Sequence, residues 1–395
     1  MKVIIAGGGI GGMSAALALL RRGIDVEVYE QASVLKEVGA GIQISPNGCR
    51  ALDSLGVFQA LKALSCDPVR KEFRLWNTGK AWPLFDLGKN AIEKYGYPYL
   101  TVYRPDLLDT LINAVQALKP DAIHLGACAG GLEQDDVSAT LVLADGRRIK
   151  GDVLMGADGW RSVIRNTLWG ECNPAFSGMV TWRGLIPMEV LPGHMQAHVG
   201  STWIGPGAHV VSYPLHRGEI MNFVATIENK IWTANAGSEA GTTEECLSDF
   251  AGWHEDVQTM IRLAPSLLKW ALMKREPIER WSLGRVSLLG DACHATLPFL
   301  AQGAVHSIED GVVLARCLEQ GLSMPAAALQ RYETARIERT SRMVRGATSN
   351  TGRFHSPELA TEASAELYLQ REWGAEPIAD RYDWLYAYDA ENVAI

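Results

Sequence analysis

The first thirty residues alternate between short apolar runs and glycines. An apolar, largely β-branched run at 3–5 leads into a glycine-rich turn, and the apolar run 13–20 ends on two arginines and Gly23. Basic residues suit the negative end of a helix dipole, and glycine is favoured just past a helix C-terminus. A second strand is expected over 24–30. The pattern therefore predicts a strand, a tight turn, a helix and a second strand, the β-α-β unit of a parallel sheet.

The glycines of this turn have the spacing of a dinucleotide-binding fingerprint. Gly7, Gly9 and Gly12 form a GxGxxG pattern that includes Ile10, and Glu30 ends the second strand. In such a unit the backbone approaches a pyrophosphate at the helix N-terminus, and an acidic residue binds ribose hydroxyls. The same fingerprint serves NAD and FAD, and a glycine turn can also occur without a cofactor. The pattern predicts a dinucleotide site but does not choose the cofactor.

The next hundred residues predict shorter elements. A glycine-flanked loop at 39–47 precedes a helix near 50–55, strands are expected at 72–76 and 100–103, and a helix runs from Arg104 to about 118. An Asp-Gly pair at 145–146 lies between two apolar segments, which is a strong hairpin signal. We therefore predict a β-hairpin over 138–155.

The pattern changes at about residue 176. Four strands with short turns are expected at 179–186, 196–204, 209–215 and 220–227, so this region predicts a mostly antiparallel sheet. The remaining segments predict a helical region over 242–272, a buried strand at 286–289, and helices at 303–318 and 325–353. The arginines of the last helix are expected on a solvated or interface face.

Composition narrows the class of protein. The 395 residues are 47% hydrophobic, without an apolar run long enough to span a membrane, and the formal net charge of -8 disfavours nucleic acid as a partner. The seven cysteines show no CxxC spacing. They predict buried thiols in a reducing compartment, the cytoplasm, and neither a disulfide framework nor a metal site.

Three motifs far apart in the chain form one set. They are the glycine turn at 7–12, Asp158-Gly159 with Arg161 and Arg165 after it, and the run Gly-Asp-Ala-Cys-His at 290–294 followed by Pro-Phe-Leu-Ala-Gln-Gly-Ala at 298–304. With this set the chain resembles the single-component FAD-dependent aromatic hydroxylases. The branch it resembles most includes salicylate hydroxylase, 3-hydroxybenzoate 6-hydroxylase and 6-hydroxynicotinate 3-monooxygenase. The resemblance covers essentially the whole chain.

The resemblance implies an FAD site. Glu30 would bind the adenosine ribose, Arg104 would lie against the cofactor, Asp158 would lie near the pyrophosphate and Asp291 would bind the ribityl chain. The helix near Gly303 would direct its amides at the flavin, where the reduced cofactor carries negative charge. The complete set of expected cofactor residues is Gly7, Gly9, Ile10, Gly12, Glu30, Gln31, Gln43, Arg104, Asp158, Asp291, Pro298, Gln302, Gly303 and Ala304. Asp158 and Asp291 could instead cap helices.

The resemblance also implies an α/β fold with a Rossmann-like FAD-binding domain. The expected division is 1–175 for its first part, 176–275 for an inserted, mostly antiparallel β-sheet substrate domain, 276–355 for its second part, and 356–395 for a C-terminal tail packed on the body. NADH or NADPH would act as a transient reductant, and the protein would be a monomer or a homodimer.

His209 and Tyr213 are the candidates for the chemistry on the substrate. On a strand, His209, Val211 and Tyr213 alternate onto one face. A phenolate is a far better nucleophile than a phenol, and a histidine within hydrogen-bond reach suits the removal of the phenol proton. The resemblance supports this role, because relatives use a histidine from the matching strand. The alternative is a histidine and tyrosine on an ordinary half-exposed strand. Cys293 and His294 are expected to be packing residues and not a nucleophilic pair.

The sequence thus predicts an FAD-dependent monooxygenase that uses NAD(P)H and dioxygen. It would hydroxylate a small phenolic aromatic acid of the salicylate, hydroxybenzoate or hydroxynicotinate type through a flavin hydroperoxide, with or without decarboxylation. One alternative is an FAD oxidoreductase of the same fold that acts on a larger or non-aromatic substrate. Another is a non-catalytic nucleotide-binding or partner-binding protein.

Overall fold

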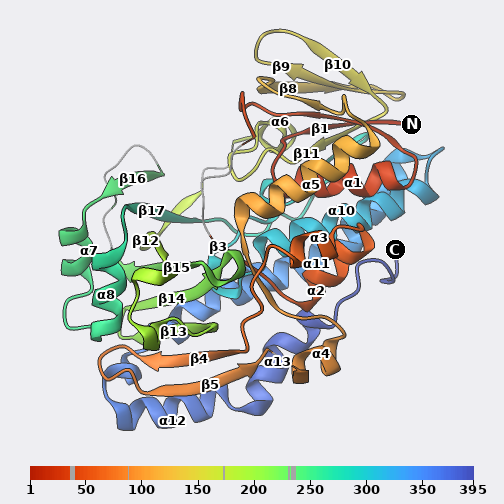
Figure 1. The fold of residues 1–395 in the computed structure, drawn as a ribbon. Coiled ribbons are helices and arrows are strands. Elements are labelled where there is room, and N and C mark those ends of the chain that lie inside the picture. The colour runs from red at the N-terminus through yellow and green to blue at the C-terminus, as the bar shows by residue number, and fades with distance from the viewer. Residues whose placement is uncertain (36–40, 88, 172–173, 230–231, 233–236) are drawn as a thin grey trace.

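A five-stranded parallel sheet organises one half of the computed structural model, which describes residues 1–35, 41–87, 89–171, 174–229, 232 and 237–395 (Figure 1). The strands lie in the order β18, β11, β1, β2 and β7, and every neighbouring pair is parallel. They span Val286–Leu288, Val153–Gly156, Lys2–Ala6, Asp25–Tyr29 and Ile123–His124. The apolar run at the start of the chain forms β1 and is fully buried, as expected for a central strand covered on both faces.

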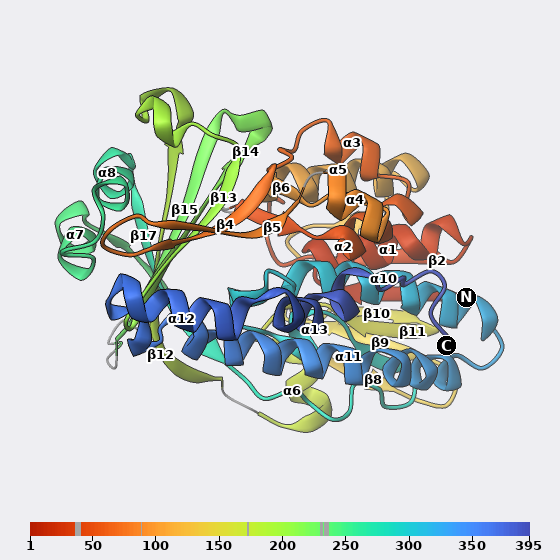
Figure 2. The ribbon, with the colours of Figure 1, turned by 90° about the horizontal axis from the view of Figure 1, so that it is seen from below.

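An eight-stranded sheet forms the other half (Figure 2). Its order is β16, β17, β12, β15, β14, β13, β4 and β5, and all pairs are antiparallel except β4 with β13. The strands span Ser238–Gly241, Leu267–Lys274, Ala175–Pro187, Ile220–Glu228, Ala208–Leu215, Val199–Gly205, Arg70–Leu75 and Ala81–Asp86. On one face, Trp182 and Phe223 pack with Phe250, which follows helix α7 (Thr243–Asp249), and with helix α8 (Glu255–Leu263). The opposite face borders a cavity.

Helices and two small sheets complete the molecule. Helix α1 (Ile10–Arg21) packs against α5 (Arg104–Leu118) and α10 (Gly303–Gln320), and α10 packs against α11 (Pro325–Phe354). The other helices are α2 (Pro46–Ser54), α3 (Phe58–Lys62), α4 (Lys89–Tyr95), α6 (Val163–Trp169), α9 (Asp291–His294), α12 (Glu362–Trp373) and α13 (Ala375–Tyr386). The small sheets pair β3 (Gly41–Ile44) with β6 (Leu100–Tyr103), and β9 (Ala139–Leu143) with β8 (Ala129–Gln134) and β10 (Arg148–Gly151).

Most elements predicted from the pattern are confirmed. The first strand, the helix and the second strand appear as β1, α1 and β2, and Gly23 has φ +71° just past the helix. The four strands expected between 179 and 227 appear as β12 to β15. The last two long helices appear as α10 and α11.

The helix prediction over 242–272 is wrong in its last part. Thr242 begins α7 with a capping box to Glu245, as a helix start requires, but residues 267–274 form β17 and pair antiparallel with β12. Pro265 is the local reason, because a proline disfavours helical backbone at the residue before it. Ala264 accordingly ends α8 in an extended conformation, with ψ 120°. Pairing of β17 with the distant strand β12 then stabilises the extended conformation, although the composition of this segment favours a helix.

Two other predictions need correction. The hairpin at 138–155 is confirmed for β9 and β10, but its second arm breaks at Asp152 and continues as β11 in the parallel sheet. The Asp152 carboxylate accepts a hydrogen bond from the Lys2 amide at 2.6 Å, which fixes this change of sheet. Of the loop expected at 39–47, residues 41–44 form strand β3, whereas Gly39 and Ala40 lie outside the described residues.

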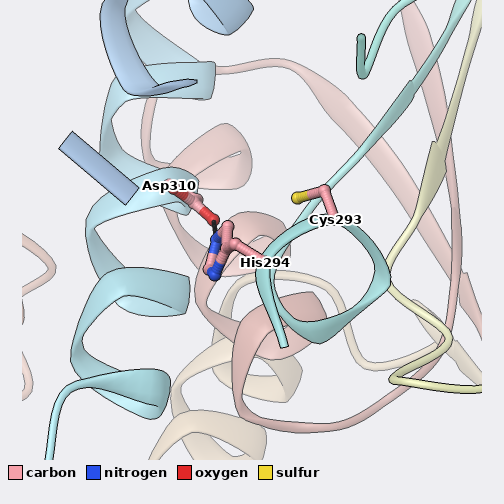
Figure 3. A group of neighbouring side chains, drawn as sticks. All are labelled: Cys293, His294 and Asp310. Atoms are coloured by element: carbon pink, nitrogen blue, oxygen red, sulfur yellow. Dashed lines mark hydrogen bonds and ion pairs between the residues drawn. The ribbon is translucent and has the colours of Figure 1, made fainter. Parts of the chain in front are cut away.

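The prediction that the arginines of the last long helix lie on a solvated or interface face is wrong for Arg336 and Arg339, whose side chains are 0% and 8% exposed. Arg336 is fully buried, and its Nε donates to Asp310 Oδ1 of α10 at 2.7 Å. The same carboxylate holds His294 of α9 through Oδ2 at 2.6 Å (Figure 3). The spacing of the arginines gave no sign of this burial, because the acids that hold them lie on a different helix.

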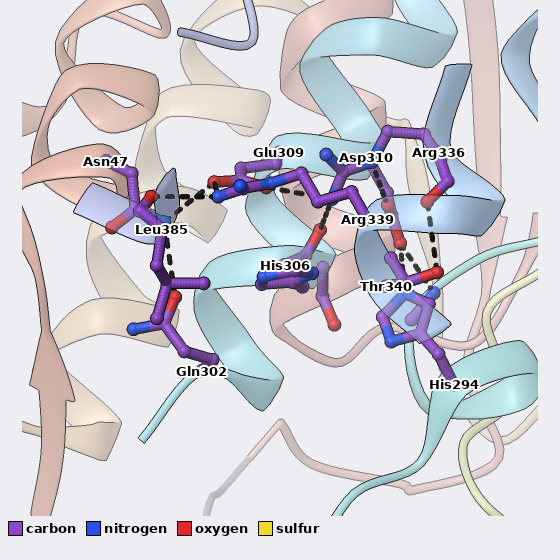
Figure 4. Close-up of polar contacts among 12 residues, drawn as sticks. Asn47, His294, Gln302, His306, Glu309, Asp310, Arg336, Arg339, Thr340 and Leu385 are labelled. Atoms are coloured by element: carbon purple, nitrogen blue, oxygen red, sulfur yellow. Dashed lines mark hydrogen bonds and ion pairs between the residues drawn. The ribbon is translucent and has the colours of Figure 1, made fainter. Parts of the chain in front are cut away.

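The neighbouring acid extends this contact into a buried ion cluster (Figure 4). Glu309, also on α10, lies 2.9 Å from the guanidinium groups of both Arg336 and Arg339, and it accepts a hydrogen bond from Asn47 of α2. Burial alone would raise the pKa of Asp310, but its interactions with His294 and Arg336 hold that pKa at about 2. The cluster therefore stays charged and joins helices α2, α9, α10 and α11.

Within the described residues, no helix has both the length and the apolar character needed to cross a lipid bilayer.

We predict that Arg336→Met strongly destabilises the protein. Two buried carboxylates would lose a partner, and breaking a buried ion pair from one side costs about 3–5 kcal/mol. Urea unfolding followed by circular dichroism measures the free energy of unfolding. Arg345→Met, at an exposed position of the same helix, is the matched control and should change that free energy by less than about 0.5 kcal/mol. Equal stabilities of the two variants would contradict the structural role of the cluster.

Candidate active site

Two adjoining cavities lie between the parallel sheet and the eight-stranded sheet. The first has a volume of about 450 Å³ and the second about 530 Å³. Gly9, Arg104, Arg183 and Asp291 line both cavities, so the two form one elongated space. One end reaches Glu30 and the other reaches the strand face that carries His209. This shape suits an extended dinucleotide with a small second ligand beyond one end.

The glycines of the first turn have three different structural roles. Gly7 has φ +109°, and a Cβ there would lie 2.3 Å from the Ala157 carbonyl oxygen. A Cβ on Gly12 would lie 2.0 Å from the Gly7 carbonyl oxygen, so this glycine permits close packing of α1 on the turn. Gly9 has open space beside it and borders both cavities. This arrangement leaves room for a pyrophosphate against the backbone at the N-terminus of α1.

Glu30 borders the second cavity at the end of β2. Its carboxylate accepts hydrogen bonds from the amides of Gly8 and Ala32, at 2.7 and 2.8 Å. Each carboxylate oxygen can accept a further bond, so the group is fixed in place and still able to bind ribose hydroxyls. Gln31, the other residue predicted here, is exposed and lines neither of the two cavities.

Asp158 binds the start of helix α6, whose N-cap is Ser162. Its carboxylate accepts hydrogen bonds from the Ser162 hydroxyl and from the amides of Val163 and Ile164. Its neighbours Ala157 and Gly159 line the first cavity. The motif therefore positions the cavity wall. The contacts of the Asp158 side chain are those of a residue that binds a helix start, which is the alternative that the sequence left open.

Arg165 connects the second motif with the third. It is almost fully buried, and its guanidinium donates to the carbonyl oxygen of Ala292 at 3.1 Å. Ala292 follows Asp291, which lies at the junction of the two cavities on the first residue of α9. Gly290 precedes it with φ +65°, and a Cβ there would lie 2.8 Å from Ser307 Oγ. The glycine is thus needed where β18 turns toward Asp291.

The N-terminus of α10 closes the far end of the cofactor space. Pro298, Gln302, Gly303 and Ala304 all line the first cavity. The Gln302 side chain donates to Ser45 Oγ at 2.8 Å. It also accepts a hydrogen bond from Asn47 at 3.2 Å (Figure 4). These contacts hold the start of α10 against α2. The free amides of the first helical turn there present a partial positive charge to any ligand in the cavity.

The sheet face opposite α10 carries the two candidate residues for substrate chemistry. His209, Val211 and Tyr213 all line the first cavity, so the predicted alternation of β14 puts them on one face. Both His209 and Tyr213 are almost fully buried, which removes the alternative of a half-exposed strand. Phe299 and Phe354 lie against the His209 ring, with ring centroids 5.0 and 5.2 Å away. The histidine thus borders the cavity with two apolar rings against its own ring.

Three further residues of this region were missed from the sequence. Lys71 of β4 and Arg183 of β12 line the cavity. His355, at the end of α11, contacts His209, with 2.7 Å between His355 Nε2 and His209 Nδ1. His355 lies 146 residues from its partner, so no local pattern could have indicated the contact. Lys71 lies directly before the strand predicted at 72–76, so the predicted strand did not include it.

The triad of Cys293, His294 and Asp310 is the one group of potential metal ligands found among the described residues (Figure 3). Asp310 is already bound by Arg336 and by the Gly290 amide, and the Cys293 thiol donates to the Gly290 carbonyl oxygen. Burial raises the pKa of Cys293 well above its usual value, so the thiol keeps its proton. An adjacent guanidinium disfavours a cation, and the group therefore belongs to the ion cluster.

The residues around the cavities fit FAD. The glycine turn leaves its backbone open to a pyrophosphate, Glu30 keeps acceptors for ribose hydroxyls, and Arg104 lines the junction between the two halves. The start of α10 supplies amides where an isoalloxazine ring would carry negative charge when reduced.

Comparison with known proteins agrees with this fit. Residues 1–347 match the family described as "FAD binding domain". The chain is 37% identical to a 3-amino-4-hydroxybenzoate 2-monooxygenase of Streptomyces platensis and 34% identical to a 3-hydroxybenzoate 6-hydroxylase of Polaromonas naphthalenivorans, in each case over 99% of this chain and 97% of the relative. A solved structure of HpxO from Klebsiella pneumoniae with FAD and uric acid superposes with a TM-score of 0.84, at 30% identity, over 97% of this chain and 96% of that one.

These matches confirm the resemblance inferred from the three motifs, together with the α/β fold class and FAD as the cofactor. The chain belongs to the FAD-dependent aromatic hydroxylases, which are monooxygenases.

Proposed function

We propose that this enzyme hydroxylates a small aromatic acid with an ionisable ring hydroxyl, and that His209 is the base that removes the hydroxyl proton. The observation that carries the proposal is the position of His209, buried on the cavity face that lies opposite the start of α10. When bound, FAD takes electrons from NADH or NADPH and supplies the activated oxygen. The protein's own task is then to bind the ring, ionise it and exclude water.

Tyr213 is proposed to orient the ring hydroxyl. Burial raises its pKa to about 12, against the opposing effects of Arg183 and of a hydrogen bond with Gln43, so it stays a neutral donor. Gly41 makes room for it, since a Cβ at that position would lie 2.6 Å from the Tyr213 ring. The base and the donor thus have separate roles on one strand face.

Lys71 is proposed to bind the carboxylate of the acid. Its ammonium donates to Tyr99 Oη at 2.9 Å, and Tyr99 donates in turn to Gln43 at 2.8 Å. A lysine has three donors, so this contact leaves two for a ligand in the cavity. Burial lowers the pKa of Lys71 to about 7, and an anion beside it would restore the charged form.

The nature of the acid is narrowed by the relatives. The family members named above act on 3-amino-4-hydroxybenzoate and 3-hydroxybenzoate. The sequence favours acids of the salicylate, hydroxybenzoate or hydroxynicotinate type. The structure with uric acid, a ring system without a carboxylate, supports a purine as the second candidate. A larger or non-aromatic substrate remains the alternative within the same fold.

The rest of the proposal concerns the whole chain. We retain residues 1–175 and 276–355 as the FAD-binding domain, 176–275 as the substrate domain and 356–395 as the tail. Strands β4 and β5 of the first segment add to the sheet of the substrate domain. We also propose a monomer or homodimer in the cytoplasm. In support, every cysteine among the described residues is free, and all but Cys128 are buried.

The test of the function is a spectrum followed by a substrate panel. Purified protein should be yellow, with the absorbance of bound flavin. NADH and NADPH oxidation in air is then followed with salicylate, 3-hydroxybenzoate, 3-amino-4-hydroxybenzoate, 6-hydroxynicotinate and uric acid, and products are identified by mass. An acid that accelerates oxidation and gains one oxygen atom supports the proposal. Acceleration by uric acid alone would favour the second candidate, and yellow protein that responds to none would contradict both.

We predict that His209→Ala keeps its flavin but loses most of its hydroxylation rate. General bases contribute roughly 10²- to 10⁴-fold, so kcat should fall by that order near neutral pH and recover toward alkaline pH, where the substrate ionises unaided. Product formation across pH measures this. His194→Ala, at an exposed histidine, is the control and should behave like the wild type. An unchanged rate at neutral pH would remove His209 from the role of base.

We predict that Lys71→Met weakens binding of the acid more than it slows the reaction. Loss of a charged hydrogen bond of about 1.5–3 kcal/mol corresponds to a rise in KM of roughly 10- to 100-fold. In the wild type, KM should rise as pH increases through about 7, because the free lysine then loses its proton, and the variant should lack this dependence. Lys150→Met, on an exposed strand position, is the control. A KM unaffected by the substitution would show that the carboxylate binds elsewhere.

A further inference from the structure

His209 is the first of three side chains that connect the cavity with the protein surface. Its Nδ1 lies 2.7 Å from His355 Nε2, and His355 Nδ1 lies 3.0 Å from Glu228 Oε1. The His209 and His355 side chains are almost fully buried, whereas the Glu228 side chain is 54% exposed. A continuous hydrogen-bonded path thus leads from the cavity to solvent.

The backbone holds the three residues in this order. The Gly207 amide donates to the His355 carbonyl oxygen at 3.1 Å, and the Glu228 amide donates to the Gly207 carbonyl oxygen at 2.9 Å. Gly207 precedes β14, Glu228 ends β15, and His355 is the C-cap of α11. Since the turn before β14 is bonded to both other segments, the contacts follow from the fold and not from chance rotamers.

The ionised Glu228 determines the tautomer of both histidines. A carboxylate only accepts hydrogen bonds, so His355 Nδ1 carries a proton and its Nε2, in the neutral ring, is an acceptor. His209 must then donate from Nδ1 to His355. This leaves a lone pair on His209 Nε2, the nitrogen that a base needs to remove a proton from a ligand in the cavity.

We propose that His355 and Glu228 form a proton relay that carries the proton taken by the buried His209 to solvent. The inference rests on the proposed role of His209 as base. As Nε2 of His209 gains the substrate proton, the Nδ1–H bond of His209 breaks, and this proton forms an N–H bond with His355 Nε2. The His355 Nδ1 proton passes to Glu228 and then to water. The reverse sequence returns a proton to the product oxygen and restores both tautomers.

The surroundings of His209 explain why a relay is needed. Burial, together with the nearby His355, holds the pKa of His209 well below its usual value, so a charged imidazolium is not a stable place for the proton. Phe299 and Phe354 border the ring and exclude water from that side. Burial also lowers the pKa of His355, whereas Glu228 raises it. The other ionisable residues that line the cavity are Lys71, Arg104, Arg183, Tyr213, Asp291 and Tyr382.

The relay affects only the rate of proton transfer, and this effect distinguishes it from a structural role of His355 and Glu228. The proton reaches the same solvent with or without the path, so loss of the relay slows proton transfer but leaves its end point and the affinity for the acid nearly unchanged. The probe is the acid of the panel that accelerates NADH oxidation most, bound to the oxidised enzyme without reductant. A stopped-flow jump from acid to alkaline pH then follows the phenolate absorbance of the bound ring.

We expect His355→Gln to slow the appearance of phenolate by about 10²-fold, the lower end of what proton-transfer groups contribute. Glu228→Gln, a surface change that should not affect folding, should slow it as well, and Glu228→Asp should restore part of the rate. The final phenolate amplitude should stay at the wild-type level in all three. Glu239→Gln, an exposed acid on β16, is the matched control.

Wild-type rates in both His355→Gln and Glu228→Gln, combined with a slow His209→Ala, would leave the base in place and overturn the relay. Slow variants that also lose amplitude or affinity would assign a structural role to the two residues and likewise overturn it. If the wild type forms no phenolate with any acid of the panel, the proposed function fails, and the relay fails with it.

Discussion

The buried ion cluster beneath α10 is the constraint on which the site depends. Glu309 and Asp310 are consecutive, so they leave the helix in different directions and share only Arg336 among the partners named here. Glu309 binds Arg339 and Asn47, Asp310 binds His294, and Arg336 binds both acids. Charges in a dry interior tolerate little displacement, because a lost partner leaves an uncompensated charge. The cluster therefore fixes α10 in position more strictly than apolar packing would.

That position matters because α10 presents its first turn to the cofactor space. Asn47 bonds to both Glu309 and Gln302, so one amide side chain connects the ion cluster to the cavity wall. Asp310 also binds the Gly290 amide, just before Asp291. The tail takes part too, since Arg339 donates to the carbonyl oxygens of Trp384 and Leu385. Residues from distant parts of the sequence thus hold the flavin end of the site before any ligand binds.

The sequence predicted the features that depend on short stretches of chain. The glycine turn, Glu30 at the end of a strand and the alternation of His209 and Tyr213 are all local patterns, and each is found in the structure. The failures have a common physical origin. Strand β17 and the burial of Arg336 both depend on partners from other parts of the chain. Pairing and burial of that kind leave no periodic trace in the segment itself.

The same distinction separates the two sides of the cavity. The cofactor side is built from motifs whose residues are neighbours in sequence, so related chains can share it while they act on different rings. The substrate side is assembled across the fold: Lys71 comes from β4, His209 from β14 and His355 from the end of α11. Each of these can change without disturbing the glycine turn or α10. Substrate choice and proton transfer can therefore differ between related chains that share the same cofactor site. The side chains of the sheet are the ones to test when the acid is identified.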